Sequence, residues 1–302
     1  MDKTASVEDL TQGVTVRATG LLTDPGGKSV HAAVVTEQLF GAARLVTAFG
    51  GANGRRAEEL LGTYTGLATT TTRIGSETRE TWTVVSGTSG AILEVTAPAP
   101  NVSTAELADL WLAIERSMPA TVLVGGGSLP LGVGDDFYAR LTELGRNSGA
   151  LVLVDATGET LKQALSAGPY LVKPNLNEAS ALLGIDLEDS PPQGALNAAL
   201  AIREMGAENV WLTLGSIGSI LATDDGQGRS FGAVPANVVN TVGCGDAMMG
   251  AAAGALASGS DLISAVAIGV AAAASQAETL SPIGVDVATV RKARGNVLVE
   301  VM

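Results

Sequence analysis

Cysteine, histidine, aromatic side chains and positive charge are all scarce in this 302-residue sequence. Cys244 is the only cysteine, so no disulfide can form within the chain, and a reducing, cytoplasmic location is expected. The 18 Lys and Arg residues stand against 31 Asp and Glu residues, a formal net charge of −13. Such an acidic chain repels phosphate backbones and anionic lipids. The composition therefore argues against a general nucleic-acid binder or membrane-surface protein.

Long apolar runs are missing as well. The most apolar stretch, residues 265–274, is about half as long as the roughly 20 residues that a membrane-spanning helix needs, and we expect a buried helix there. The first ten residues lack the basic and apolar segments of a secretory signal peptide. The chain is therefore expected to remain inside the cell, with 46% hydrophobic residues to build a large core.

Strand-like and helix-like patterns alternate along most of the chain. The expected strands are 43–49, 121–124, 151–155, 170–173 and 210–214. The expected helices are 28–40, 55–61, 104–117, 135–147, 159–167, 177–183, 194–205, one from about residue 246, and 262–277. This order predicts an α/β fold in which helices cover both faces of a mostly parallel sheet.

Two β-rich segments, at about 11–23 and 69–95, fall outside this alternation. We expect them to pair into a small lid sheet over the functional site. No repeat or interdomain linker is evident, so residues 1–302 are predicted to form a single domain.

The segment Asn240–Gly259, NTVGCGDAMMGAAAGALASG, is the most informative for chemistry. Its glycine-rich turn leads directly into a helix, so backbone N–H groups and the positive end of the helix dipole can hold an anion there. Asp246 lies within reach of such an anion and could take a proton from an attacking hydroxyl. On this segment alone, an ordinary helix cap explains Asp246 equally well.

Six collinear segments carry a resemblance to a known family. TVGCGDAMMGA is similar to TVGAGDSM, the hallmark of the ribokinase-like (PfkB) carbohydrate kinases. The others are DPGGKSVHAA, GGGSLPLGV, VDATGETLKQAL, VKPNLNE and LTLGSIGSIL, which resemble the family's PGGKGxNVA, SGSLPPGV, VDSSGEAL, KPNxxE and SLGxxGAL. The combination is most similar to the phosphosugar branch, which comprises 1-phosphofructokinase, the minor 6-phosphofructokinase and tagatose-6-phosphate kinase. The resemblance implies a three-layer α/β/α sandwich with a small β lid.

The resemblance also implies roles on the nucleotide side. Asp246 would be the catalytic base, and the amides of Gly243, Cys244 and Gly245 would hold the transferring phosphoryl group of ATP. Asn175 and Glu178 would organise Mg²⁺ through waters. The remaining nucleotide contacts would be Lys173, Thr213, Gly215, Gly218, Val242, Val270 and Ala274. Ordinary core packing explains Val270 and Ala274 about as well.

On the sugar side, the resemblance implies contacts from Asp2, Gly27, Lys28, Arg79 and Ser128. Lys28 would act as a point charge and Arg79 as a two-pronged donor for the phosphate that the substrate already carries. The only histidine, His31, stands where the family usually has Asn, and Ser29, Thr81 and Gly126 also depart from the family pattern. His31 is a candidate sugar or phosphate contact, and a helix-surface histidine is an equal alternative.

Two features at motif positions leave alternatives open. MDKTASVEDL is similar to LDxTxxVDDL, which in the family follows a buried strand. Either the sequence starts inside a longer chain, or the protein lacks this strand. A missing strand would leave an exposed strand edge and a mobile Asp2.

Cys244 replaces the family's usual Ala. A packed thiol is expected, although a helix N-terminus can lower a thiol pKa and make the thiol reactive.

The sequence thus favours an ATP- and Mg²⁺-dependent kinase of a phosphorylated ketohexose: fructose 1-phosphate, fructose 6-phosphate or tagatose 6-phosphate. The alternative is a non-catalytic sugar-phosphate or nucleotide-binding protein with the same fold, favoured by the departures on the sugar side. A dinucleotide-binding dehydrogenase is disfavoured because GGKS stands where GxGxxG would be needed. Because a small lid sheet cannot bury both of its faces alone, a homodimer through the lid is expected.

Overall fold

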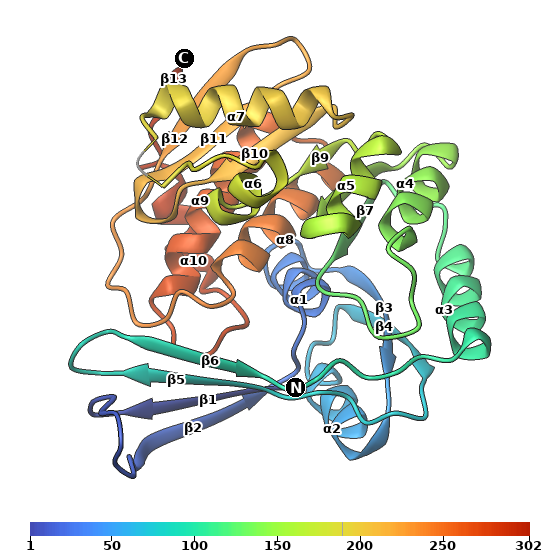
Figure 1. Cartoon of the computed structure of the whole chain (residues 1–302), viewed down its shortest axis with the longest axis vertical. Coiled ribbons are helices and arrows are strands. Elements are labelled where there is room, and N and C mark those ends of the chain that lie inside the picture. The colour runs from blue at the N-terminus through green and yellow to red at the C-terminus, as the bar shows by residue number, and fades with distance from the viewer. Residues whose placement is uncertain (189) are drawn as a thin grey trace.

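A computed structural model describes residues 1–188 and 190–302 and has three layers with a separate small sheet below them (Figure 1). The central sheet has the order β13-β12-β11-β10-β9-β8-β7. Its strands are β7 (Val122–Gly126), β8 (Leu151–Asp155), β9 (Leu171–Val172), β10 (Asn209–Thr213), β11 (Gly218–Ala222), β12 (Gly228–Gly232) and β13 (Val299–Val301). The first four in chain order pair in parallel and the last three pair antiparallel, so the sheet is mixed, with its parallel part beside the site.

Helices cover both faces of this sheet. One face carries α4 (Phe137–Asn147), α5 (Gly158–Ser166), α6 (Leu176–Leu183) and α7 (Pro192–Glu204). The other carries α1 (Lys28–Phe40), α8 (Cys244–Ala257), α9 (Leu262–Ala277) and α10 (Val287–Arg294). Among the described residues, no helix is both long and apolar enough to cross a bilayer.

Apolar side chains that alternate in direction along the buried strands pack into the two halves of the core, one on each face of the sheet. In β10, Val210 and Leu212 pack toward α4–α7, whereas Trp211 between them packs against α8 and α9. In β8, Val152 and Val154 likewise face one layer and Leu153 the other. Period-two alternation of apolar residues on both faces is what a strand buried between two helical layers requires.

The lid is a four-stranded sheet of order β2-β1-β5-β6. It consists of β1 (Asp2–Val7), β2 (Ala18–Asp24), β5 (Thr81–Ser86) and β6 (Ile92–Thr96). Its actual strands differ from the expected segments. Residues 11–17 form no strand, residues 2–7 add one, and β4 (Leu67–Arg73) pairs instead with β3 (Ala43–Phe49). Pairing partners distant in sequence decide sheet membership, and local β propensity does not report them.

The β3–β4 pair forms a sheet of its own beside α2 (Gly51–Leu61) and α3 (Thr104–Arg116). Within the described residues, one edge of β3 and the outer edge of β7 have no strand partner, and both edges line a cavity of about 1050 Å³. Asp2 is not mobile at this end of the chain. It is 9% exposed and pairs within β1 against β2 and β5.

Candidate active site

The cavity extends from the β3 and β7 edges to the place where the lid, α1 and the start of α8 meet. The sequence-predicted residues that line it are Asp2, Gly27, Lys28, His31, Arg79, Ser128, Lys173, Asn175, Glu178, Thr213, Val242, Gly243, Gly245 and Asp246. Asp2, Thr81 and Thr83 project from alternate positions of the lid strands into this space. The structure thus brings together residues that are up to 244 positions apart in the chain.

Gly243 makes the turn that starts α8. Its φ of +86° favours glycine, and a Cβ there would lie 1.9 Å from the Pro282 carbonyl oxygen. The fully buried Asn240 holds the approach to this turn, because its side chain accepts from the Val242 N–H and donates to the Leu280 carbonyl. A bulkier residue at 243 would therefore break the start of the helix.

The backbone N–H groups that are available to an anion at this helix start differ in part from the expected set of Gly243, Cys244 and Gly245. The Cys244 N–H donates to the Thr241 carbonyl at 3.3 Å. Within the described residues, the N–H groups of Gly243, Gly245 and Asp246 have no protein acceptor. The candidate anion hole is therefore formed by these three amides, at the positive end of the helix dipole, and the Cys244 amide is not part of it.

Asp246, in the first turn of α8, contacts the only histidine. Asp246 Oδ2 lies 2.7 Å from His31 Nδ1, and Asp2 Oδ2 lies 3.0 Å from His31 Nε2. His31 is 4% exposed, so it is not a helix-surface residue. Burial alone would lower the pKa of His31, but the adjacent carboxylates of Asp2 and Asp246 outweigh burial and raise the pKa to about 10.

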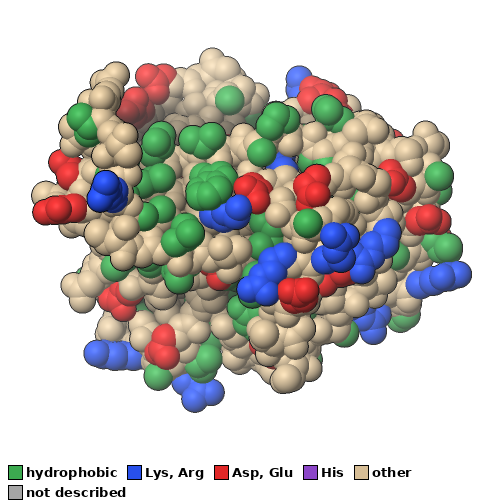
Figure 2. Space-filling model, turned by 90° about the horizontal axis from the view of Figure 1, so that it is seen from below, with side chains coloured by type: hydrophobic (Ala, Val, Ile, Leu, Met, Phe, Trp, Pro, Cys, Tyr) green, Lys and Arg blue, Asp and Glu red, His purple; other side chains and the backbone are tan. Residues whose placement is uncertain are grey.

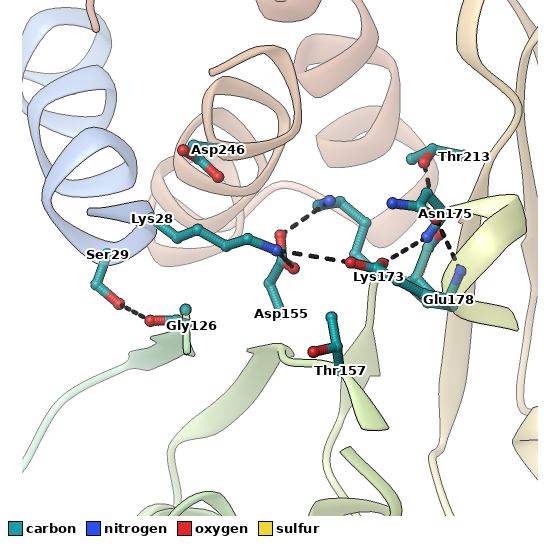
Figure 3. Close-up of polar contacts among 12 residues, drawn as sticks. Lys28, Ser29, Gly126, Asp155, Thr157, Lys173, Asn175, Glu178, Thr213 and Asp246 are labelled. Atoms are coloured by element: carbon teal, nitrogen blue, oxygen red, sulfur yellow. Dashed lines mark hydrogen bonds and ion pairs between the residues drawn. The ribbon is translucent and has the colours of Figure 1, made fainter. Parts of the chain in front are cut away.

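Two lysines meet at one buried carboxylate (Figure 3). Lys28 Nζ, from the start of α1, lies 2.7 Å from Asp155 Oδ1, and Lys173 Nζ, after β9, lies 2.9 Å from Asp155 Oδ2. Asp155 is 3% exposed. Burial alone would raise the pKa of Asp155, but the two ammonium groups hold this pKa below its ordinary value. Lys28 is therefore held in place by Asp155 while its partly exposed side chain still lines the cavity.

This lysine pair is close to the helix start of α8. A Cβ placed on Gly245 would lie 3.1 Å from Lys173 Nζ, so glycine leaves room for the ammonium group there. Lys28 Nζ also lies 3.8 Å from Glu178 Oε1. Asp155 and Glu178 thus fix the two ammonium groups beside the candidate anion hole.

Asn175 and Glu178 form a capping box at the start of α6. The Asn175 side chain accepts from the Glu178 N–H at 2.9 Å, and the Glu178 carboxylate accepts from the Asn175 N–H at 2.8 Å. Thr213 lies beside them, bridged to Asn175 through the backbone (Figure 3). The second carboxylate oxygen of Glu178 faces the cavity side, toward Lys28.

Arg79 and Ser128 form a second polar group on the cavity wall. The Arg79 guanidinium donates to Ser128 Oγ at 2.5 Å, which joins the segment before β5 to the loop after β7. The guanidinium has five N–H donors in a fixed plane, so most of its capacity is left for an anion. Nearby, Ser29 donates to the Gly126 carbonyl at 3.1 Å (Figure 3).

Four of the sequence-predicted nucleotide contacts do not line this cavity. Gly215 begins the short 3-10 turn after β10 and Gly218 follows it, and both have positive φ. Val270 is 5% exposed and packs in the core between α9 and the sheet, whereas Ala274 is half-buried. Val270 therefore has the core packing that was the alternative to an ATP contact.

The Cys244 thiol is not activated. Burial, together with the nearby Asp246 carboxylate, raises the pKa of Cys244 to about 12, and Sγ lies 3.5 Å from the Ala273 carbonyl oxygen. The possibility of a thiol pKa lowered by the helix N-terminus is therefore wrong, because burial outweighs the dipole here. Cys244 is instead a packed thiol, the other possibility given by the sequence.

Sequence reasoning missed Asp155 and Asn240 as site residues. Asp155 ends the apolar run LVLVD, and a carboxylate at the end of a buried strand was the available signal. Asn240 gave no comparable signal, because its role depends on its contact with the Leu280 carbonyl.

Comparisons with known proteins agree with this geometry. Residues 1–286 match the model of the pfkB family carbohydrate kinases. The chain is 32% identical over 276 residues to an ATP-dependent 6-phosphofructokinase isozyme 2 of Mycobacterium tuberculosis, covering 91% of this chain and 80% of that protein. It is 30% identical over 270 residues to a 1-phosphofructokinase of Rhodobacter capsulatus, covering 87% and 82%.

Solved structures are similar over the same extent. Phosphofructokinase-2 of Escherichia coli, in complex with substrates and products, superposes with a TM-score of 0.89 at 28% identity, covering 98% of this chain and 95% of that chain. A tetrameric inhibited form of the same E. coli enzyme superposes with a TM-score of 0.85 at 27% identity, with the same coverage.

Proposed function

The chain belongs to the pfkB family of carbohydrate kinases, which are ATP-dependent phosphotransferases, and we propose that its own acceptor is a ketohexose phosphate. Fructose 6-phosphate or fructose 1-phosphate would yield fructose 1,6-bisphosphate, and tagatose 6-phosphate is the third candidate. One observation carries the proposal. A carboxylate, three unpaired helix-start amides and an arginine–serine pair line the same cavity.

Asp246 acts as the base in this proposal. It stands in the first turn of α8, next to the amides of Gly243 and Gly245. A hydroxyl bound beside it can lose its proton to the carboxylate while its oxygen attacks a phosphoryl group held at the amides. Positioning and charge stabilisation supply most of the rate enhancement of phosphoryl transfer, and both are provided by this one helix start.

Lys28 and Lys173 stabilise the charge that develops on the transferred group. Asp155 holds both ammonium groups in place, and Lys173 stands against Gly245. Their fixed positions mean that little reorganisation is needed when negative charge moves between ATP and the acceptor.

The residues fit a magnesium ion held mainly by water and substrate phosphates. Within the described chain, no group of three or more acidic, His or Cys side chains could form a protein cage for a metal. Glu178 keeps one carboxylate oxygen outside its capping contact, and Mg²⁺ commonly takes one or two carboxylates and retains waters. Bound there, the ion would neutralise phosphate charge, with Glu178 and Asn175 holding it through waters.

Arg79 supplies the preference for a phosphorylated sugar. Its guanidinium stands on the cavity wall beside Ser128. A planar five-donor group matches a phosphate with two parallel hydrogen bonds, so a sugar that carries a phosphate gains contacts that an unphosphorylated sugar lacks. Asp2, close to Asp246 through His31, would accept hydrogen bonds from the sugar hydroxyls.

We also propose a homodimer through the lid. The lid's outer face carries Leu21, Trp82, Leu93 and Val95, which are 59%, 39%, 51% and 56% exposed. Figure 2 shows apolar side chains gathered on the side of the molecule that carries the lid. A second copy of the same face would bury this apolar sheet surface.

An ADP-release assay with Mg-ATP tests the proposal. The panel is fructose 1-phosphate, fructose 6-phosphate, tagatose 6-phosphate, fructose, ribose and adenosine. We expect turnover on at least one phosphosugar, and Asp246→Asn lowers kcat by about 10²-fold or more because the proton acceptor is lost. If ATP and a sugar phosphate bind to a folded protein that turns over no member of the panel, the non-catalytic alternative holds.

Two arginine variants, Arg79→Ala and the control Arg73→Ala, test the proposed contact with the sugar's phosphate. Arg79→Ala should lower kcat/KM for the phosphosugar by about 10- to 100-fold, the loss expected for a charged hydrogen bond. Arg73→Ala removes an exposed arginine at the end of β4 that pairs with Glu58 on α2, and it should leave kcat/KM unchanged. Equal kinetics for Arg79→Ala and Arg73→Ala would remove the phosphate contact from the proposal.

A further inference from the structure

His31 connects three segments that are distant in the chain. It stands at the end of the first turn of α1, between Asp246 in the first turn of α8 and Asp2 at the start of the lid strand β1. Its Nδ1 lies 2.7 Å from Asp246 and its Nε2 lies 3.0 Å from Asp2. The candidate base and the candidate sugar-binding carboxylate are therefore held by the two ends of one imidazole ring.

The charge of this ring follows from its two neighbours. A neutral imidazole has one N–H donor and one lone pair, so one of its nitrogens would present a lone pair to a buried carboxylate. Only the imidazolium, in which both ring nitrogens carry a proton, can direct an N–H toward each of the two carboxylates. The contacts are unequal: Nδ1 makes a hydrogen bond with Asp246, whereas Nε2 is near Asp2 without hydrogen-bond alignment.

The surroundings of the ring are mostly acidic. The charged groups that face it are Asp2 on β1, Asp24 on β2, Glu94 on β6, Asp246 on α8 and, next to Asp246, Lys28 on α1. Removing the ring's charge would leave several carboxylates close together with one lysine already bound to Asp155. The 4% exposure of His31 leaves water little access to compensate.

We propose that His31 is a positioning residue that, as an imidazolium, joins Asp246 to Asp2 and so fixes the proton acceptor against the sugar-binding site. This deepens the proposed function and rests on it for its catalytic part. The sequence pattern suggested His31 as a direct sugar or phosphate contact. Both ring nitrogens instead face carboxylates, so His31 acts on the substrate through Asp2 and Asp246.

The first test needs no substrate and no variant. Because His31 is the only histidine, the two ring nitrogens of the ¹⁵N-labelled full chain give one unambiguous pair of signals in a long-range ¹H–¹⁵N correlation spectrum. Both nitrogens should report the protonated ring at pH 7.5, with a titration midpoint near 10. A neutral ring at pH 7.5 would overturn the proposal.

Three carboxyl variants separate the specific contacts from general acidity. Asp246→Asn and Asp2→Asn each remove a partner of the ring, and each should lower the proton affinity of His31 by about tenfold or more, one pKa unit. Asp24→Asn is the matched control, because Asp24 lies near His31 without contacting the ring nitrogens. An equal effect of Asp24→Asn would overturn the two-ended arrangement.

The kinetic test compares His31→Asn with the native chain on the best substrate of the panel. We expect kcat to fall by about 10- to 100-fold while KM for ATP stays unchanged, because the loss concerns orientation of the acceptor. The native chain should lose activity as pH rises through about 10, and His31→Asn should lack this alkaline loss. Full kcat in a folded His31→Asn protein overturns the positioning role. If no panel member is turned over, the proposed function fails, while the titration still decides the state of the ring.

Discussion

Asp155 is the residue on which two cations of the site depend. Lys28 and Lys173 both have their ammonium groups within 2.9 Å of its carboxylate, and Asp155 and Lys173 are buried. Removing one partner of a buried charge group leaves the other partners without compensation, which costs more than the intact group contributes. The carboxylate therefore matters for folding as well as for the placement of the two lysines.

We expect Asp155→Asn to lower the free energy of unfolding by about 3 kcal/mol, because the buried Lys173 ammonium loses its counter-charge and the partly exposed Lys28 loses one of its two acidic partners. Since the pKa of Asp155 is lowered on folding, its stabilising effect is present above the unfolded pKa of about 4 and is lost as pH falls through the folded pKa. Urea unfolding at pH 7 and below pH 4 measures both effects. The exposed Asp109→Asn on α3 is the control. Equal stabilities of the two variants at pH 7 would contradict the prediction.

How far single residues could be predicted from sequence depended on whether their role was local. The start of α8 was predictable, because a glycine turn before a helix is a property of adjacent residues. His31 was recognised as a departure from the family pattern, but its partners Asp2 and Asp246 are 29 and 215 positions away. Lys28 was predicted as a contact for the sugar's phosphate and stays so, but its pairing with Asp155, 127 positions away, has no sequence signature.

At the scale of elements, the contact between α1 and α8 places the site. Gly250 on α8 lets the two helices approach closely, since a Cβ there would lie 2.2 Å from the Ala32 carbonyl oxygen on α1. Thr36 of α1 also donates to the Gly250 carbonyl at 2.7 Å. This close approach sets the distance between His31, which directly precedes Ala32 on α1, and Asp246, which stands one turn before Gly250 on α8.

Gly250→Ala should therefore destabilise the protein by about 1–3 kcal/mol, because backbone on the facing helix cannot yield as a flexible side chain would. The measurement is the urea midpoint at constant m-value. Gly62→Ala, at the end of α2, is the matched control: its φ is −62° and its nearest neighbours would lie 3.4 Å from the new Cβ. It should change stability by less than about 1 kcal/mol, in either direction. If Gly250→Ala left the urea midpoint unchanged, α1 and α8 could move apart without loss of stability, which would contradict the prediction.

The elements themselves were predictable where periodicity was strong. The expected helices and strands between residues 100 and 215 lie within a few residues of the observed ones. Two short elements, α10 and β13, were not expected from the sequence; α10 packs against α9, and β13 forms the far edge of the central sheet. The lid boundaries were wrong because β1 gives little local signal and β4 pairs with β3. Strand pairing between segments 24 residues apart, as for β3 and β4, or 79 residues apart, as for β1 and β5, is decided by tertiary packing.

At the scale of the whole molecule, charge and apolar surface are unevenly arranged. The chain carries a net charge of −13, yet four of its cationic side chains, Lys28, Arg44, Arg79 and Lys173, stand among five carboxylates in the cavity lining. This placement suits anionic ligands at one site and leaves the rest of the surface repulsive to them. On the outer face of the lid, Lys3 lies over the Trp82 ring and pairs with Glu80, so that face is apolar with a polar edge.

The native protein should therefore behave as a dimer, with a mass of about twice the 30.3 kDa of one chain in light scattering at micromolar concentration. Leu93→Lys should weaken the dimer by about 100-fold or more, because two copies of the lysine enter a twofold interface and each loses apolar burial. Leu112→Lys replaces a leucine of 42% exposure on α3, far from the lid in the fold, and should leave the dimer intact. A native monomer, or a Leu93→Lys protein that keeps the doubled mass, would contradict pairing through the lid. If Leu112→Lys alone produced monomers, the interface would lie on the α3 side instead.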